Sequence, residues 1–216
     1  MRNRRLQGRI TAGRFTLPAV ILICIVCWIG TSILLPAMSS EKEAGYALWQ
    51  SVCTLYLPAW ADRVISFMLY AAIGYFLIEL NNTFAIIRMR ASVQTSIYFL
   101  LVTICPGMHL LYAGDIAAVA FLISLFFLFK SYQHPRPVSY IFHSFVFIGA
   151  GSLLFPQLLY FIPLWLIGAY YFQSLTARSF CAALIGLSVS YWFLFGHAFF
   201  YGQMELFYQP CLLYTS

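Results

Sequence analysis

The stretch IFHSFVFIGAGSLLFPQLLYFIPLWLIGAYYF, residues 141–172, decides the fold of this chain. It contains one histidine and no charged residue. Pro156-Gln157 divides it, and proline is tolerated at the start of a helix because no backbone donor is needed there. The stretch therefore predicts two membrane helices, 138–155 and 158–175, joined by a short turn. Pro163 is expected to kink the second helix.

The composition extends this interpretation to the whole chain. Of the 216 residues, 62% are hydrophobic and 8% are charged, whereas ordinary globular chains have roughly 25% charged residues. A soluble fold of this size could not cover its surface with so few charges, so lipid must be the solvent for most of the chain. Backbone groups in lipid pair within their own segment, and each apolar run is therefore expected to be a helix. The sequence predicts an all-α, polytopic transmembrane helix bundle.

Seven apolar runs are long enough to span a bilayer core. At about 1.5 Å of rise per residue, such runs reach roughly 25–33 Å. The first run could instead be a secretory signal, but its length exceeds the roughly 7–15 apolar residues of a signal, which favours an uncleaved anchor. The predicted spans are 17–36, 64–80, 92–110, 112–129, 138–155, 158–175 and 180–201.

Lysine and arginine residues between the runs set the orientation. With the N-terminus in the cytoplasm, only Lys42 and Arg63 of the twelve basic residues fall outside. Residues 1–16 then form a basic cytoplasmic arm that would rest on anionic lipid head groups. Because the net charge of +6 follows the topology, nucleic acid is not an expected partner. The inside residues are Arg2, Arg4, Arg5, Arg9, Arg14, Arg88, Arg90, Lys130, Arg136 and Arg178.

The first outer loop contains the candidate catalytic residues. Its segment 44–57 places Trp49 and Tyr56 among apolar residues at helical spacing, which predicts a short helix lying in the outer interface. Glu41 and Glu43 precede this helix, at the depth where a lipid phosphate would lie. They could act as a general base or position a metal, although a solvated Glu-Lys-Glu run is the commoner explanation.

Small residues predict where helices pack closely. Gly149 and Gly151 lack side chains within span 138–155, so a neighbouring helix can approach there. Ala182, Gly186 and Ser190 repeat at four-residue spacing in the last span, as in the small-residue faces of membrane bundles.

The remaining polar residues favour structural roles. The acids avoid the middle of the spans, which disfavours an ion-coupled transporter. His143 is expected to bond to a neighbouring helix, and Glu79 to lie at a helix end capped by asparagine. Cys24 and Cys27 form a CxxC inside the first span, where a packing pair is favoured over a metal site. No metal or cofactor is predicted.

A family resemblance covers about residues 70–196. The stretches LIELNN, IYFLLV, FIGAGSLLFPQLLYFIPLWLIGAYYFQSLTARSF and ALIGLSVSYWFLF resemble an uncharacterised family of bacterial polytopic inner-membrane proteins. The resemblance implies a multi-pass protein of the bacterial inner (cytoplasmic) membrane. It brings neither an activity nor catalytic residues.

Two functional hypotheses follow. The first is a non-enzymatic cell-envelope component, such as a membrane subunit or scaffold, with membrane lipids and other membrane subunits as partners. The second follows from architecture, because the chain is similar to the C-type glycosyltransferase superfamily, which places an acid and an interfacial helix in its first outer loop. That similarity implies a truncated glycosyltransferase that uses a lipid-linked sugar, with Glu41 and Glu43 as catalytic residues.

The last six residues, CLLYTS, correspond to the translated mosaic end of a transposase used to prepare sequencing libraries. Residues 211–216 are therefore expected to be adapter read-through. The helical bundle is assigned to residues 17–210, and the natural protein is expected to continue beyond Pro210.

Overall fold

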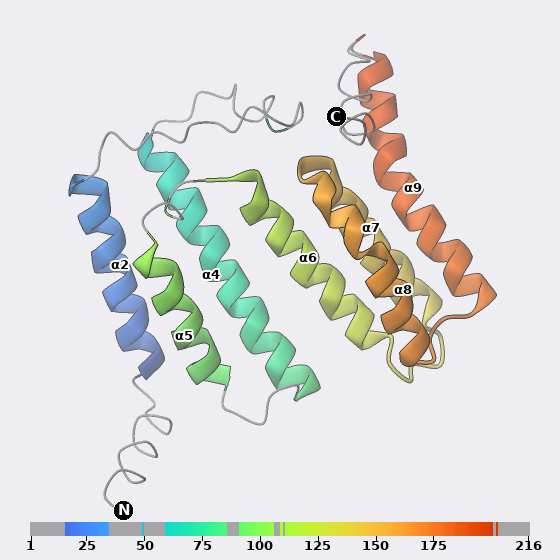
Figure 1. The fold of residues 1–216 in the computed structure, drawn as a ribbon, viewed down its shortest axis with the longest axis horizontal. Coiled ribbons are helices and arrows are strands. Elements are labelled where there is room, and N and C mark those ends of the chain that lie inside the picture. The colour runs from blue at the N-terminus through green and yellow to red at the C-terminus, as the bar shows by residue number, and fades with distance from the viewer. Residues whose placement is uncertain are drawn as a thin grey trace, which may run out of the picture. The chain divides into compact units, whose positions relative to one another are not determined.

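The computed structural model describes residues 16–34, 49, 59–85, 91–105, 109, 111–200 and 202. These residues are helical apart from short connections, and no strand occurs among them (Figure 1). The all-α prediction is confirmed. The elements are α2 (Thr16–Leu34), α4 (Ala59–Phe84), α5 (Ala91–Ile104), α6 (Ala113–Lys130), α7 (Val138–Leu154), the 3-10 helix η2 (Pro156–Phe161), α8 (Ile162–Tyr171) and α9 (Ala177–Phe200).

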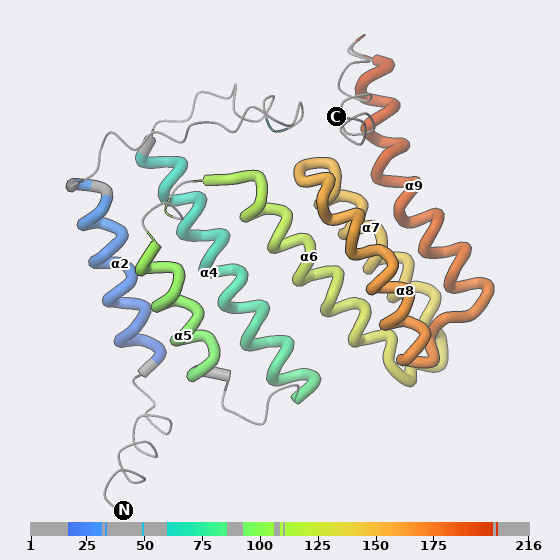
Figure 2. Tube along the Cα trace, viewed as in Figure 1, coloured from blue at the N-terminus to red at the C-terminus, as the bar shows by residue number. Residues whose placement is uncertain are grey.

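The helices belong to two compact units. Unit 1 comprises Met1–Glu41 and Pro58–Leu111, and unit 2 comprises Lys42–Leu57 and Tyr112–Ser216. Within unit 1, α5 packs against both α2 and α4. Within unit 2, α7 packs against both α6 and α9, while η2 joins α7 to α8 (Figure 2).

Three described helical segments are long and apolar enough to cross a membrane. They are Trp60–Phe84, Ala113–Lys130 and Ala177–Phe200. Shorter apolar helices cover Leu17–Thr31, Val93–Ile104 and Val138–Leu154. These six segments overlap six of the seven predicted spans, which is compatible with a membrane protein.

The predicted continuous helix 158–175 is wrong. The chain forms η2 and then the ten-residue α8, with Pro163 in the first turn of α8 rather than at a kink. Proline has no N–H and its ring clashes with the carbonyl four residues earlier, so Pro163 is tolerated near the start of an α-helix, and α8 begins at Ile162. A 3-10 helix rises about 2.0 Å per residue against about 1.5 Å for an α-helix. The two elements together therefore still reach about 27 Å.

The predicted span 92–110 is also too long. α5 ends at Ile104, and Cys105, which precedes Pro106, is not helical. The residue before a proline is pushed out of the α region, and Pro106-Gly107 follows at this point in the sequence. His109 consequently lies beyond the helix.

Small residues allow α7 and α9 to approach closely, and at Gly149 and Gly186 this agrees with the predicted packing role. A Cβ atom on Gly149 would lie 2.8 Å from the hydroxyl oxygen of Ser190, and one on Gly186 would lie 2.8 Å from the carbonyl oxygen of Phe142. Ala182 and Ser190 on the same face of α9 are buried. The predicted packing role of this face is confirmed, because a Cβ atom at Gly186 would meet the backbone of α7 and one at Gly149 would meet the side chain of Ser190.

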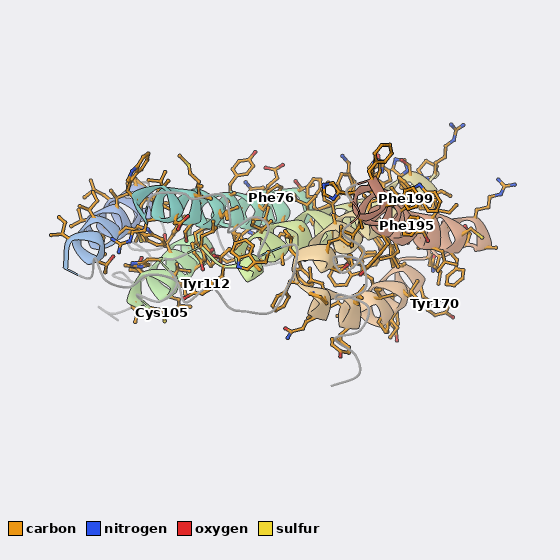
Figure 3. The ribbon with its side chains drawn as sticks, turned by 90° about the horizontal axis from the view of Figure 1, so that it is seen from above. Phe76, Cys105, Tyr112, Tyr170, Phe195 and Phe199 are labelled. Atoms are coloured by element: carbon orange, nitrogen blue, oxygen red, sulfur yellow. The ribbon has the colours of Figure 1, made fainter. Side chains whose placement is uncertain are left out.

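In unit 2, small polar side chains are buried beside an apolar core, while many large apolar side chains are exposed. Ser124, Ser144, Ser152 and Ser179 are completely buried. Large apolar side chains face outward, and Figure 3 shows Tyr170, Phe195 and Phe199 projecting from α8 and α9. The most exposed aromatic side chains of α9 are Trp192 (72%), Phe193 (74%) and Phe200 (90%).

Candidate functional site

The predicted catalytic residues Glu41 and Glu43 lie outside the described residues, as do the termini 1–15 and 203–216. Of the predicted interfacial helix 44–57, only Trp49 is described, and it is helical and buried. The interfacial helix, the catalytic acids and the adapter origin of residues 211–216 therefore stay predictions.

His143 does not bond to a neighbouring helix, so that prediction is wrong. Its Nδ1 lies 2.6 Å from the carbonyl oxygen of Ser139, one turn earlier in the same helix. Because a carbonyl can only accept, Nδ1 carries the proton. The ring stacks on Phe127 of α6 at 5.3 Å, and the residue is exposed. This arrangement orients an imidazole at the helix surface.

The prediction that asparagine ends the second span is also wrong. α4 continues to Phe84, and Ala85 takes a positive φ of 47° while its N–H donates to the carbonyl of Asn81. Asn81 therefore lies within the last turn. Glu79 accepts a hydrogen bond of 3.2 Å from the hydroxyl of Thr83, which occupies the carboxylate at the helix surface.

The two cysteines of the CxxC pair lie on different faces of α2. Cys24 is buried in α2, where its Sγ lies 2.9 Å from the donating hydroxyl of Thr103 and 3.6 Å from the carbonyl oxygen of Phe99. Cys27 is exposed. Cys24 thus packs against α5, while Cys27 faces away. Among the described residues, no three His, Cys, Asp or Glu side chains form a group that could hold a metal ion.

The strongest candidate site is a polar cluster in unit 1 around His109, which is 3% exposed. Its imidazole stacks on the indole of Trp28 in α2, with ring centroids 3.9 Å apart and an interplanar angle of 22°. Trp28 also contacts Phe67 and Tyr70 of α4, at 5.4 and 5.9 Å between centroids. The histidine thereby joins the segment after α5 to α2, and Trp28 joins α2 to α4.

The hydrogen bonds of this cluster fix the tautomer of His109. The hydroxyl of Thr31 donates to the carbonyl of Trp28 at 2.9 Å, which uses its only proton. Nδ1 of His109, 2.8 Å from the same hydroxyl oxygen, must therefore be the donor in that contact. The lone pair of the neutral ring then resides on Nε2. Nε2 is buried and has no hydrogen-bond partner among the described residues, and the same is true of Nε1 of Trp28.

Electrostatics keep this imidazole neutral. Burial, and then the nearby Arg63 guanidinium, lower the pKa of His109 from its ordinary value of 6.5. Arg63 was expected in the outer loop, but it lies in the second turn of α4 and is 9% exposed. The cluster is a neutral acceptor beside a permanent cation.

A cavity of about 240 Å³ adjoins the cluster. Arg63 and Trp28 line it together with apolar side chains of α2 and α4, including Ile25, Trp60 and Phe67. Such a cavity can take an apolar group that carries a negative charge, because the guanidinium is a donor and the walls are aliphatic and aromatic. The sequence placed His109 near an outer helix end but could not assemble this cluster.

The lysine and arginine residues that the structure describes in unit 2 lie at one end of its helices. Lys130 ends α6, Arg136 lies in the connection from α6 to α7, and Arg178 lies in the first turn of α9. Asp115 lies in the first turn of α6, at the opposite end of that helix, where it accepts the N–H of Tyr112 at 2.9 Å. The carboxylate of Asp115 therefore caps a helix rather than pairing with these cations.

No family model, curated protein or solved structure matches this chain. The family and superfamily resemblances of the sequence therefore stay predictions.

Proposed function

We propose that this chain is a non-enzymatic, multi-pass component of the bacterial inner membrane, with unit 2 as its lipid-embedded helical scaffold. The observation that carries the proposal is the exposure of large apolar side chains around a unit whose buried serines are hydrogen-bonded. In lipid an unpaired polar group costs several kcal/mol, whereas an exposed phenylalanine costs nothing.

The interior of unit 2 supports a scaffold because its polar groups bond to one another. The hydroxyls of Ser124 and Ser144 each donate to the backbone carbonyl of the other residue, at 2.8 and 2.9 Å. Nε1 of Trp165 donates to both hydroxyl oxygens, at 2.8 and 3.1 Å. This closed network ties α6, α7 and α8 together and leaves no reactive group for chemistry.

The distribution of charge supports the predicted orientation. Lys130, Arg136 and Arg178 share one end of unit 2, which is the arrangement expected of a cytoplasmic face. Gln157 lies at the start of η2, directly after the opposite end of α7, and the described residues there carry no lysine or arginine.

Membrane extraction and topology reporters test the proposal. The chain should stay in the membrane pellet after carbonate washing. Fusions after Arg136 and Arg178 should report cytoplasm, and a fusion after Gln157 should report periplasm. Release of the chain by carbonate, or an inverted pattern at all three positions, would overturn the proposal.

A further inference from the structure

A groove in unit 2 opens where α7 and α9 begin, separate from the His109 cluster. Its volume is about 1020 Å³. Arg136 and Arg178 line it with the hydroxyl residues Ser139 and Thr176, and all four are exposed. Phe142 and Ile185 line it as well. One cavity thus combines two guanidinium groups and two hydroxyls with aromatic and aliphatic surface.

No described carboxylate of unit 2 neutralises the charge of the groove. The acid that the structure describes in this unit, Asp115, caps the far end of α6. Neither arginine forms a salt bridge with a described carboxylate. The groove therefore presents two positive charges to any anion that reaches it.

Two other side chains at this end of the unit, Lys130 and His134, are engaged elsewhere. Nζ of Lys130 lies over the rings of Phe126 and Tyr140, at 5.6 and 5.7 Å from their centroids. Nδ1 of His134 accepts the backbone N–H of Arg136 at 3.2 Å. Lys130 does not line the groove, so it offers a matched cation outside the groove for comparison.

The backbone reinforces the charge of the two arginines. α7 begins at Val138 and α9 at Ala177, and both residues line the groove. The positive end of a helix dipole favours an anion within the first turn. Bidentate guanidinium contacts are well suited to phosphate oxygens.

We propose that this groove binds one anionic glycerophospholipid, with its phosphate between Arg136 and Arg178 and an acyl chain along Phe142 and Ile185. A free phosphate would use the arginines but would leave the apolar surface uncovered. A zwitterionic lipid would use the apolar surface, but its ammonium group would weaken the attraction to the arginines. The proposal rests on the membrane placement of unit 2, and it adds a specific lipid partner at the predicted cytoplasmic leaflet.

Native mass spectrometry of the full chain in detergent tests the proposal without depending on orientation. Dioleoyl-phosphatidylglycerol should bind in preference to dioleoyl-phosphatidylethanolamine. Arg136→Gln and Arg178→Gln should each weaken phosphatidylglycerol binding about fivefold, and the double variant about thirtyfold, because each basic residue contributes a similar electrostatic increment. Lys130→Gln should leave the binding unchanged.

A second variant guards against a folding defect. Ser139→Asp places a carboxylate in the first turn of α7, where the helix dipole favours it, so thermal unfolding should be unchanged. The same carboxylate should abolish the preference for phosphatidylglycerol by repelling the lipid phosphate.

Three results would overturn the lipid site. Equal binding by the double arginine variant would show that the arginines do not hold the head group. An equal loss in Lys130→Gln would show diffuse surface charge instead of a groove. Displacement of phosphatidylglycerol by millimolar inorganic phosphate would show an anion site with no acyl contribution. Each can occur while the chain still pellets with membranes, so the site can fail separately from the proposed function.

Discussion

Both units bury a tryptophan among polar groups, but only Trp165 of unit 2 has a described hydrogen-bond partner for its indole N–H. Trp165 donates to two serine hydroxyls and is 2% exposed. Trp28 of unit 1 is 8% exposed, and its Nε1 has no hydrogen-bond partner among the described residues. His109, stacked on Trp28, leaves its Nε2 unpaired in the same way.

This difference between paired and unpaired buried polar groups affects both stability and the capacity to bind a ligand. A closed hydrogen-bond network in a low-dielectric interior holds helices rigidly, and it has no capacity left for a ligand. An unsatisfied buried donor and acceptor destabilise their unit unless something pairs with them. The buried network of unit 2 therefore stabilises its helices, whereas the cluster in unit 1 leaves a donor and an acceptor that no described residue pairs with.

Removal of the Trp165 side chain should have the largest effect on stability. Trp165→Ala removes a buried ring that packs against Phe121 and opens a cavity in the core. We expect a loss of about 3–5 kcal/mol in the free energy of unfolding. Unfolding by titration with sodium dodecyl sulfate in mild detergent measures it.

Trp192→Ala is the matched control, because Trp192 is a 72% exposed tryptophan of the same unit. Its loss should stay within about 0.5 kcal/mol. Equal losses for the two variants would mean that the buried network does not stabilise unit 2.

Replacement of each buried indole by phenylalanine sharpens the comparison. Trp165→Phe removes a satisfied donor and should cost about 1–3 kcal/mol. Trp28→Phe removes a donor that has no partner among the described residues, so its cost should be smaller by about 1 kcal/mol. Detergent unfolding of both variants gives the difference. A larger loss for Trp28→Phe would show that its Nε1 is satisfied in the folded protein.

Acidification should weaken unit 1 through His109. The folded-state pKa is lowered below the ordinary 6.5, so the unfolded chain binds more protons between the two values. The contribution of His109 to stability is complete above about pH 6.5 and is lost as the pH falls below it. Thermal unfolding at pH 7.5 and pH 5.0 should show the loss in the wild type and a smaller one in His109→Asn. An identical pH dependence of the two proteins would contradict the assigned burial.

The sequence predicted the helical class and the small-residue packing positions on α7 and α9, because both depend on local pattern. Gly149, Gly186 and Ser190 could be recognised from spacing alone. The ends of the helices were harder to predict from the sequence. Pro163 was expected to bend a helix but instead lies where one starts. The predicted span 92–110 ran past Pro106-Gly107, although the helix ends before this pair.

The candidate site could not be predicted because its members are far apart in the chain. Thr31 and His109 are 78 positions apart, and their contact depends on how α2, α4 and α5 pack. Trp28 and Thr31 share one face of α2, which is the one local signal that the sequence offered. Arg63 was misplaced because a lone arginine before an apolar run was expected to lie in a loop.

The outward apolar face of α9 is the central claim, and nitroxide accessibility tests it most directly. A spin label at Phe193→Cys, in a cysteine-free chain in lipid vesicles, should collide with oxygen more often than with a water-soluble nickel chelate, because oxygen concentrates in lipid. A label at Gln133→Cys, in the exposed connection between α6 and α7, should show the reverse. Nickel collisions at position 193 as frequent as those at position 133 would contradict the account, because the apolar face would then be in water.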